Sequence, residues 1–188
     1  MSQDKKIPKP VTAQSLRNAA LRYLDRFATS RENLRQVLMR RVQKSHYHHN
    51  TSLEEASQWI EDLLDKLQDA KFVDDLRYAE GRAGALHRKG TSQRVIRMKL
   101  KEKGIREEDI NQALDALREE TDSPNLERDA AIALAKRRRL GPWRLPEKRK
   151  AMRDKDLAAL ARAGFSYDLA QDIINASTVE ELEKFTNN

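Results

Sequence analysis

Three of the four histidines in the sequence, His46, His48 and His49, lie within four residues in the stretch HYHHN. Imidazole nitrogens are common zinc ligands, so this cluster is the first candidate for metal chemistry. Zinc needs its ligands in a fixed tetrahedral arrangement, and the adjacent His48 and His49 cannot readily converge on one ion from a single backbone segment. We therefore expect the cluster to lie in a loop between two helices and to hold no metal.

Hydroxyl and carboxyl groups could serve in nucleophilic or acid–base catalysis, but their positions indicate structural roles. Several hydroxyl residues precede apolar helical patterns and are predicted to cap helices: Thr29, Ser52, Ser92, Ser166 and Thr178. Asp74 and Asp75 stand at a predicted helix start, where carboxylates offset the helix dipole. The sequence also contains no cysteine and no glycine-rich phosphate loop. We expect neither an enzyme nor a cofactor.

Basic residues carry the strongest functional signal. Residues 82–106 hold nine basic residues and one acidic residue, and a second basic run surrounds Trp143. Cations pair with phosphates and an indole ring can stack on bases, so we predict a DNA- or filament-binding surface. Its residues are Arg82, Arg88, Lys89, Arg94, Arg97, Lys99, Lys101, Lys103, Lys136, Arg137, Arg138, Arg139, Trp143, Arg144, Lys148, Arg149 and Lys150. The alternative is a solvated helix face, with Trp143 filling a gap between modules.

Apolar residues recur at helical spacing along the whole chain, as in the run from Leu16 to Phe27 and in the pair Leu34 and Leu38. Thr29 with Glu32 three positions later is predicted to form a capping box and to start a helix. No segment alternates with the period of two that a strand requires. The sequence therefore predicts an all-α protein.

The apolar helical pattern occurs three times along the chain. A Thr-Ser pair precedes apolar residues at the same spacing at residues 29–38 and 91–100, and the helix ends LKEKGI and LARAGF are alike. Gly104 and Gly164 supply the left-handed stops. We predict a flexible arm over 1–14, three-helix repeats over 15–72, 73–120 and 121–176, and a tail with a short helix over 177–188. Small modules need neighbours for stability, so the three tandem repeats should form an elongated, curved array.

Charge and composition narrow the class of protein. The net charge is +7 and the isoelectric point is near 9.7, which favours a polyanionic partner. In each repeat a basic region precedes an acidic third helix, so stacked repeats could align their basic flanks in one strip. The absence of cysteine fits a reducing cytosol, and no apolar run approaches a membrane span. We expect a cytoplasmic monomer with no membrane partner.

The stretch KFVDDLRYAEGRAGALHRKGTSQRVIRMKLKEKGIREEDINQAL resembles the central signature of the RecX family, regulators of the RecA recombinase. LRYLDRFATSRENLRQVL resembles that family's first repeat and LARAGFSYDLAQDII its last, so the similarity spans about residues 16 to 176. The matching residues are Asp74, Asp75, Tyr78, Ala79, Lys89, Gly90, Leu100, Lys103, Gly104, Ile105, Gly164 and Phe165. The family often has a second glycine and an aromatic residue where this chain reads Gly90-Thr91-Ser92, and HYHHN resembles a local insertion.

The resemblance implies a non-enzymatic regulator that lies in the groove of the RecA filament on single-stranded DNA. It would inhibit ATP hydrolysis and strand exchange, with roles in homologous recombination, DNA repair and the SOS response. Contact with single-stranded DNA would be weak or confined to the filament. Two alternatives remain open at this stage: a stand-alone duplex reader that uses residues 92–103 as a helix-turn-helix recognition helix, and a scaffold that binds protein through its acidic third helices.

Overall fold

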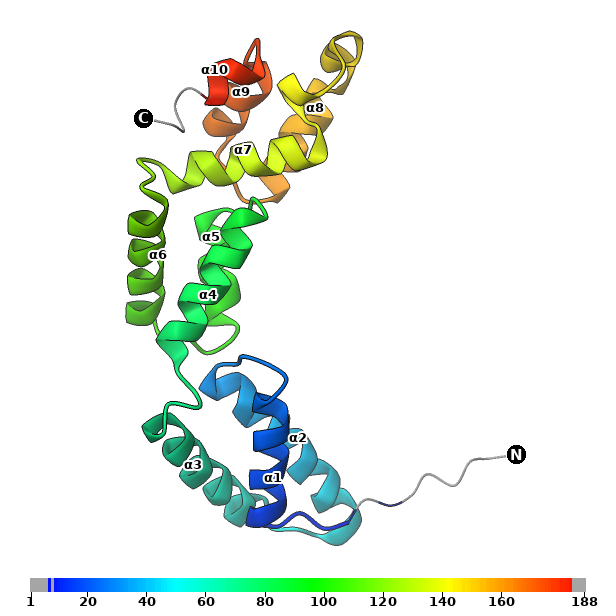
Figure 1. Cartoon of the computed structure of the whole chain (residues 1–188). Helices are drawn as coiled ribbons and strands as arrows, with labels where there is room; N and C mark the ends of the chain where they lie inside the picture. Colours follow the sequence, from blue (N-terminus) through cyan, green and yellow to red (C-terminus); the bar gives the residue numbers. More distant parts are fainter. Residues whose placement is uncertain (1–6, 8, 184–188) are drawn as a thin grey trace, which may run out of the picture. The chain divides into compact units, whose positions relative to one another are not determined.

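The computed structural model describes residue 7 and residues 9–183 of the chain. This part contains ten α-helices and one short 3-10 helix, and no strand (Figure 1). They are α1 (Ala13–Leu24), α2 (Arg31–His49), α3 (Leu53–Asp69), α4 (Asp75–Arg88), α5 (Gln93–Lys101), α6 (Glu107–Thr121), α7 (Leu126–Arg138), η1 (Gly141–Trp143), α8 (Pro146–Arg162), α9 (Tyr167–Asn175) and α10 (Val179–Glu183). The prediction of an all-α chain built from three tandem three-helix repeats is confirmed: α1–α3, α4–α6 and α7–α9.

Both ends of the chain extend beyond the described residues. Residues 1–6 and 8 of the predicted arm, 1–14, lie outside them, and α1 begins within the described part of the arm at Ala13. The amide of Val11 donates a 2.9 Å hydrogen bond to the Ser45 hydroxyl, so the chain just before α1 is bound to α2. Residues 184–188 of the predicted tail also lie outside the described part, and α10 occupies the described portion of that tail.

The helices divide into two compact units. The first runs to Tyr78 and also includes Lys103–Ile105, and the second comprises Ala79–Glu102 and the chain from Arg106 onward. Lys103 belongs to the first unit because it contacts the start of α2. The Ser30 hydroxyl donates to the Lys103 carbonyl oxygen at 2.6 Å, and Lys103 Nζ donates to Asn33 Oδ1 at 2.9 Å.

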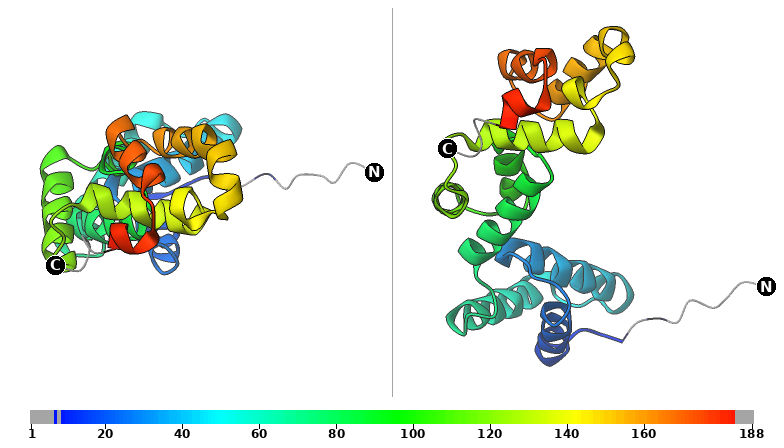
Figure 2. Two further views of the ribbon diagram at one scale, coloured as in Figure 1. Left: turned by 90° about the horizontal axis from the view of Figure 1, so that it is seen from above. Right: turned by 45° about the horizontal axis from the view of Figure 1, so that its top comes forward.

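The first unit is a three-helix bundle in which α1, α2 and α3 contact one another in pairs (Figure 2). Its core joins Leu34 and Leu38 of α2, Ile60 and Leu64 of α3, and Leu16 of α1, all at most 1% exposed. The four-residue spacing places each pair on one helix face, which is why the periodicity could be read from the sequence. Burying each such side chain stabilises the fold by about 2 kcal/mol.

Ser30 caps α2, so the prediction that Thr29 caps this helix is wrong. Ser30 has an extended backbone, and its hydroxyl accepts the Asn33 amide at 3.2 Å. Thr29 is buried and accepts a 2.8 Å hydrogen bond from the Asn33 side chain instead. Both residues can cap helices, and the backbone path alone decides which one does.

The histidine cluster is helical, which corrects the expectation of a loop. His46, His48 and His49 form the last turn of α2, and Asn50 ends the helix in the left-handed conformation at φ 53°. His46 Nδ1 lies 2.8 Å from the Thr51 carbonyl oxygen. The helix extends to His49 because the residue that ends it is Asn50. Asparagine tolerates the left-handed conformation, and the sequence has no glycine here that would have indicated the helix end.

The second unit has its own core within α7, α8 and α9, where Ala130, Leu134, Leu160 and Ile173 are at most 2% exposed. The interruption LGPWRLPE appears as the single turn η1, after which α8 begins at Pro146. Proline suits the first position of a helix because its missing N–H would have no partner within the helix.

Candidate nucleic-acid interface

The turn between α4 and α5 packs tightly against α7 within the second unit. Gly90 lies in this turn at φ 71°, and a Cβ atom there would stand 2.5 Å from the Leu134 amide nitrogen and 2.7 Å from the Ala130 carbonyl oxygen. Any other residue would collide with the backbone of α7 and would also adopt an unfavourable conformation. The glycine therefore fixes how closely the basic α4–α5 turn approaches α7.

This contact brings two basic segments into one neighbourhood. Arg137 and Arg138 follow Ala130 by seven and eight residues, so they extend the same face of α7 on which Gly90 rests. Lys89 precedes Gly90 directly, and all three cationic side chains are exposed. Lys89, Arg137 and Arg138 are named here the joint cluster.

The first turn of α5 is held by the third repeat. The Ser92 hydroxyl donates to the Ala163 carbonyl oxygen at 2.9 Å, and the Gln93 amide donates to Glu127 Oε2 at 2.8 Å. Arg94 follows, with its guanidinium Nη2 3.2 Å from the position a Cβ of Gly164 would take, beside the end of α8. A cation at the end of a helix is favoured by the helix dipole.

Ten of the predicted cations make no side-chain hydrogen bond or ion pair with another described residue. They are Arg82, Arg88, Lys89, Arg94, Lys99, Arg137, Arg138, Arg139, Lys148 and Lys150. All are exposed except Lys99, which is half-buried. Lys136, in the last turn of α7, is exposed as well. Cationic side chains that are exposed to water and have no protein partner are available to bind phosphates.

Three predicted cations are engaged inside their units. Arg97 Nη1 lies 2.9 Å from Glu107 and 2.6 Å from the Asn111 amide oxygen, and Lys101 Nζ lies 2.6 Å from the same Glu107. The hydrogen bond from Lys101, supported by the charge of Arg97, lowers the pKa of Glu107 below its usual value. Lys103 bonds to Asn33, as described above. These side chains link helices and have less freedom to meet a partner.

Arg144 and Arg149 also stabilise the fold. Arg144 makes two hydrogen bonds, of 2.6 and 3.0 Å, to Asp156, which is 2% exposed and also accepts the Gly141 amide at 3.0 Å. The hydrogen bonds that Arg144 donates to the Asp156 carboxylate raise the pKa of Arg144. Arg149 donates to the carbonyl oxygens of Pro142, Arg144 and Ser177. Both arginines thus hold η1, whose half-buried Trp143 packs on the core of the second unit.

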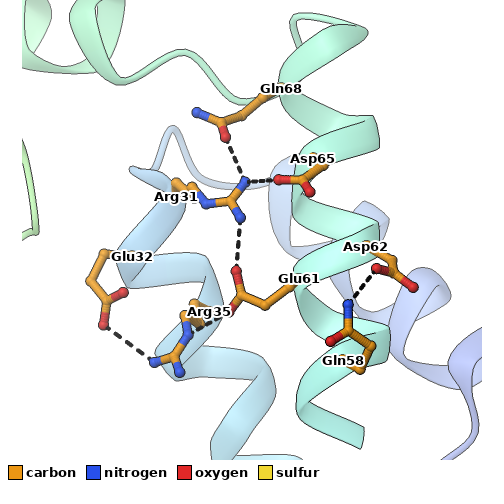
Figure 3. Close-up of polar contacts among 8 residues, drawn as sticks. All are labelled: Arg31, Glu32, Arg35, Gln58, Glu61, Asp62, Asp65 and Gln68. Atoms are coloured by element: carbon orange, nitrogen blue, oxygen red, sulfur yellow. Dashed lines mark hydrogen bonds and ion pairs between the residues drawn. The ribbon is translucent and has the colours of Figure 1, made fainter. Parts of the chain in front are cut away.

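The first unit shows why each repeat has a basic second helix and an acidic third. Arg31 of α2 reaches Glu61, Asp65 and Gln68 of α3 at 2.6 to 2.8 Å, and Arg35 reaches Glu61 at 2.7 Å (Figure 3). Burial by itself lowers the pKa of Arg31, but its hydrogen bonds to Asp65 and Glu61 outweigh this effect and raise it. Part of the charge pattern therefore pairs helices within a repeat.

The sequence analysis missed that acidic residues at helix starts join one repeat to another. Asp75 accepts the Arg31 amide at 2.8 Å, and Glu127 accepts the Gln93 amide at the same distance, so each binds the first amide of an earlier middle helix. Both stand in the first turn of a repeat's opening helix, and this shared position was the available signal. Asp74, in contrast, accepts the Arg77 amide in its own helix.

The described residues contain no group of three or more histidine or acidic side chains placed to hold a metal ion. No helix among residues 9–183 is both long and apolar enough to cross a bilayer.

Comparisons with known proteins point to one family. Residues 74–114 match the domain described as RecX, second three-helix domain. The chain is 41% identical to Regulatory protein RecX of Myxococcus xanthus over 92% of this chain and 90% of that protein. It is 30% identical to Regulatory protein RecX of Agrobacterium fabrum over 89% and 85%. The crystal structure of RecX from Lactobacillus salivarius is similar in fold, with a TM-score of 0.59, 24% identity, and coverage of 92% of this chain and 97% of that one.

Proposed function

Because the chain belongs to the RecX family of regulatory proteins, we propose that it binds the RecA recombinase filament on single-stranded DNA and inhibits the filament's ATPase and strand-exchange activities. Binding supplies the whole effect, and the protein performs no reaction of its own. A bound molecule would hinder the filament's subunits from growing, hydrolysing ATP or exchanging strands. The site of action is cytoplasmic, and the protein acts as a monomer.

The observation that carries this proposal is the joint cluster. Lys89, Arg137 and Arg138 are exposed, lack partners among the described residues and lie on either side of the packed contact between Gly90 and α7. Because the backbone of both cationic segments is held by packing, only their side chains lose freedom on binding phosphates, whereas cations on a mobile loop would also lose backbone freedom. The surface therefore suits a polyanion such as the strand inside a recombinase filament.

The stand-alone duplex reader is less well supported. A recognition helix uses its first turn to reach base edges in the major groove. In this chain the first turn of α5 is occupied, because Ser92 and Gln93 are bonded to Ala163 and Glu127. The scaffold hypothesis also loses some support, since Glu61 of α3 and Glu107 of α6 are already paired with arginines and a lysine of their own repeats.

The test adds the protein to recombinase and single-stranded DNA and measures ATP hydrolysis and strand exchange. The triple variant Lys89→Glu, Arg137→Glu, Arg138→Glu should lose inhibition, because three attractive charges become repulsive. A matched control, Arg40→Glu, Arg41→Glu, Lys44→Glu, changes the charge equally at exposed positions of α2 and should inhibit like the unaltered protein. Absence of inhibition by the unaltered protein would overturn the function, and equal inhibition by the two variants would overturn the joint cluster.

A further inference from the structure

A groove of about 540 Å³ lies between α1 and α3 in the first unit. The large apolar residues of its lining, called here its floor, are Leu21, Trp59, Leu63, Leu67 and Phe72. Leu21 is 39% exposed and Phe72 is 63% exposed, so apolar surface faces solvent beside a well-packed core. Large apolar side chains gathered in a concave surface are typical of binding sites.

The charges around this groove have a definite sign. Arg17 from α1 and Lys66 from α3 line it, and both are exposed with no hydrogen bond or ion pair to another described residue. The only acid in the lining, Asp62, already accepts a 2.8 Å hydrogen bond from the Gln58 amide. With two cations and one carboxylate, the lining carries a net positive charge beside its apolar floor.

Glu61 and Asp65 of α3 do not cancel these cations, because their carboxylates are paired with arginines of α2. Glu61, Asp65 and Gln68 point to Arg31 and Arg35 of α2, whereas Asp62 points away from this network (Figure 3). Trp59, Leu63 and Lys66 share a different face, at spacings of four and three residues. The face of α3 that holds Glu61, Asp65 and Gln68 thus contacts α2. The face that holds Trp59, Leu63 and Lys66 lies along the groove.

We propose that this groove binds an acidic amphipathic helix of a partner protein. Leucine-like side chains of the partner would lie along Trp59 and Leu63, and its carboxylates would pair with Arg17 and Lys66. A second copy of this chain fits poorly, because face-to-face grooves would bring like charges together. A nucleic acid strand fits poorly as well, since two cations over an apolar floor leave most of its phosphates unpaired. The inference goes beyond the proposed function, because it assigns a protein contact to the first unit independently of the joint cluster.

The test uses the full chain and a synthetic helix of about 16 residues, with leucines three or four residues apart on one face and glutamates on the other. A second peptide replaces every glutamate with lysine. The glutamate peptide should shift the indole N–H resonance of Trp59 in the NMR spectrum and leave that of Trp143 unchanged. The lysine peptide should shift neither resonance.

The double variant Arg17→Glu, Lys66→Glu should weaken binding of the glutamate peptide about tenfold or more. The double variant Arg40→Glu, Lys44→Glu carries the same charge change outside the groove and should bind like the unaltered chain. Equal binding of the two peptides, or equal loss in the two variants, would overturn the proposal. A Trp59 shift caused by a single-stranded oligonucleotide, and abolished by the groove variant, would assign the groove to nucleic acid and also overturn it.

Discussion

The hydroxyl of Ser92 donates a 2.9 Å hydrogen bond to the carbonyl oxygen of Ala163, 71 residues further along the chain. In the first unit, Ser30 donates in the same way to Lys103, at 2.6 Å. Each serine also accepts the amide three residues later, so one hydroxyl caps its own helix and holds the end of the next repeat's middle helix. This double role explains why a serine stands at the same place in both Thr-Ser pairs.

Replacing Ser92 with alanine should destabilise the second unit by about 2 kcal/mol, because the change removes a helix cap and leaves the Ala163 carbonyl without its partner. Ser166→Ala is the matched control, since Ser166 caps α9 and makes no hydrogen bond to another repeat among the described residues. That change should cost about 1 kcal/mol. Urea denaturation measures both, and equal losses would show that the bond between repeats contributes nothing.

Gly90→Ala should destabilise the protein by at least about 2 kcal/mol, because the new Cβ would collide with the backbone of α7 at a positive φ. Gly81→Ala is the opposite case. No atom lies within 4 Å of a Cβ built at Gly81, inside helix α4, so alanine there should stabilise by about 0.5 to 1 kcal/mol. Thermal unfolding of the two variants measures the contrast, and a tolerated Gly90→Ala would contradict the close approach.

Asp156→Ala should cost roughly 3 kcal/mol, since it removes a buried carboxylate that holds both Arg144 and the Gly141 amide. Asp154→Ala, two residues away, alters a carboxylate whose side chain is 96% exposed and should change stability little. Chemical denaturation distinguishes the two variants. A small loss for Asp156→Ala would mean that η1 is held by other contacts.

Glu107 should titrate below the usual range of a glutamate. Because its pKa is depressed in the folded state, the stability it contributes is present above the pKa of the unfolded chain and is lost as the pH falls through the folded pKa. Lys101→Met removes the hydrogen bond that lowers the pKa most, so the Glu107 pKa should move back up. NMR titration of the carboxyl carbon measures this change, and an unmoved pKa would assign the shift to Arg97.

Salt dependence provides a test of the joint cluster. If Lys89, Arg137 and Arg138 each neutralise one phosphate of single-stranded DNA, their reversal should reduce the slope of log K against log salt by about 2. Fluorescence anisotropy with a labelled oligonucleotide between low and physiological salt measures the slope. An unchanged slope would place the phosphate contacts elsewhere on the chain.

Helices, caps and stops could be predicted because they depend on local interactions. The four-residue spacing of Leu34 and Leu38 and the stops at Gly104 and Gly164 are properties of a few neighbouring residues, and the structure confirms them. Thr29 and the histidine cluster were misplaced by local reasoning. Choosing between the adjacent caps Thr29 and Ser30 depends on contacts with α1, such as the hydrogen bond from the Asn33 side chain to the Tyr23 hydroxyl. The end of α2 at Asn50 was a local signal, because asparagine tolerates the left-handed conformation and the His46–Thr51 contact spans only five residues.

By itself, the sequence determined an all-α chain of three tandem repeats with an excess of cations. Apolar periodicity, capping residues and charge depend only on single residues and their close neighbours in the chain. Only the tertiary structure decided which cations remain free. Lys89 and Arg144 are alike in sequence terms, yet Lys89 is exposed without a partner, while Arg144 is held by the buried Asp156. That difference arises from pairings between distant segments, whose energies depend on distance and burial and therefore exist only in the folded chain.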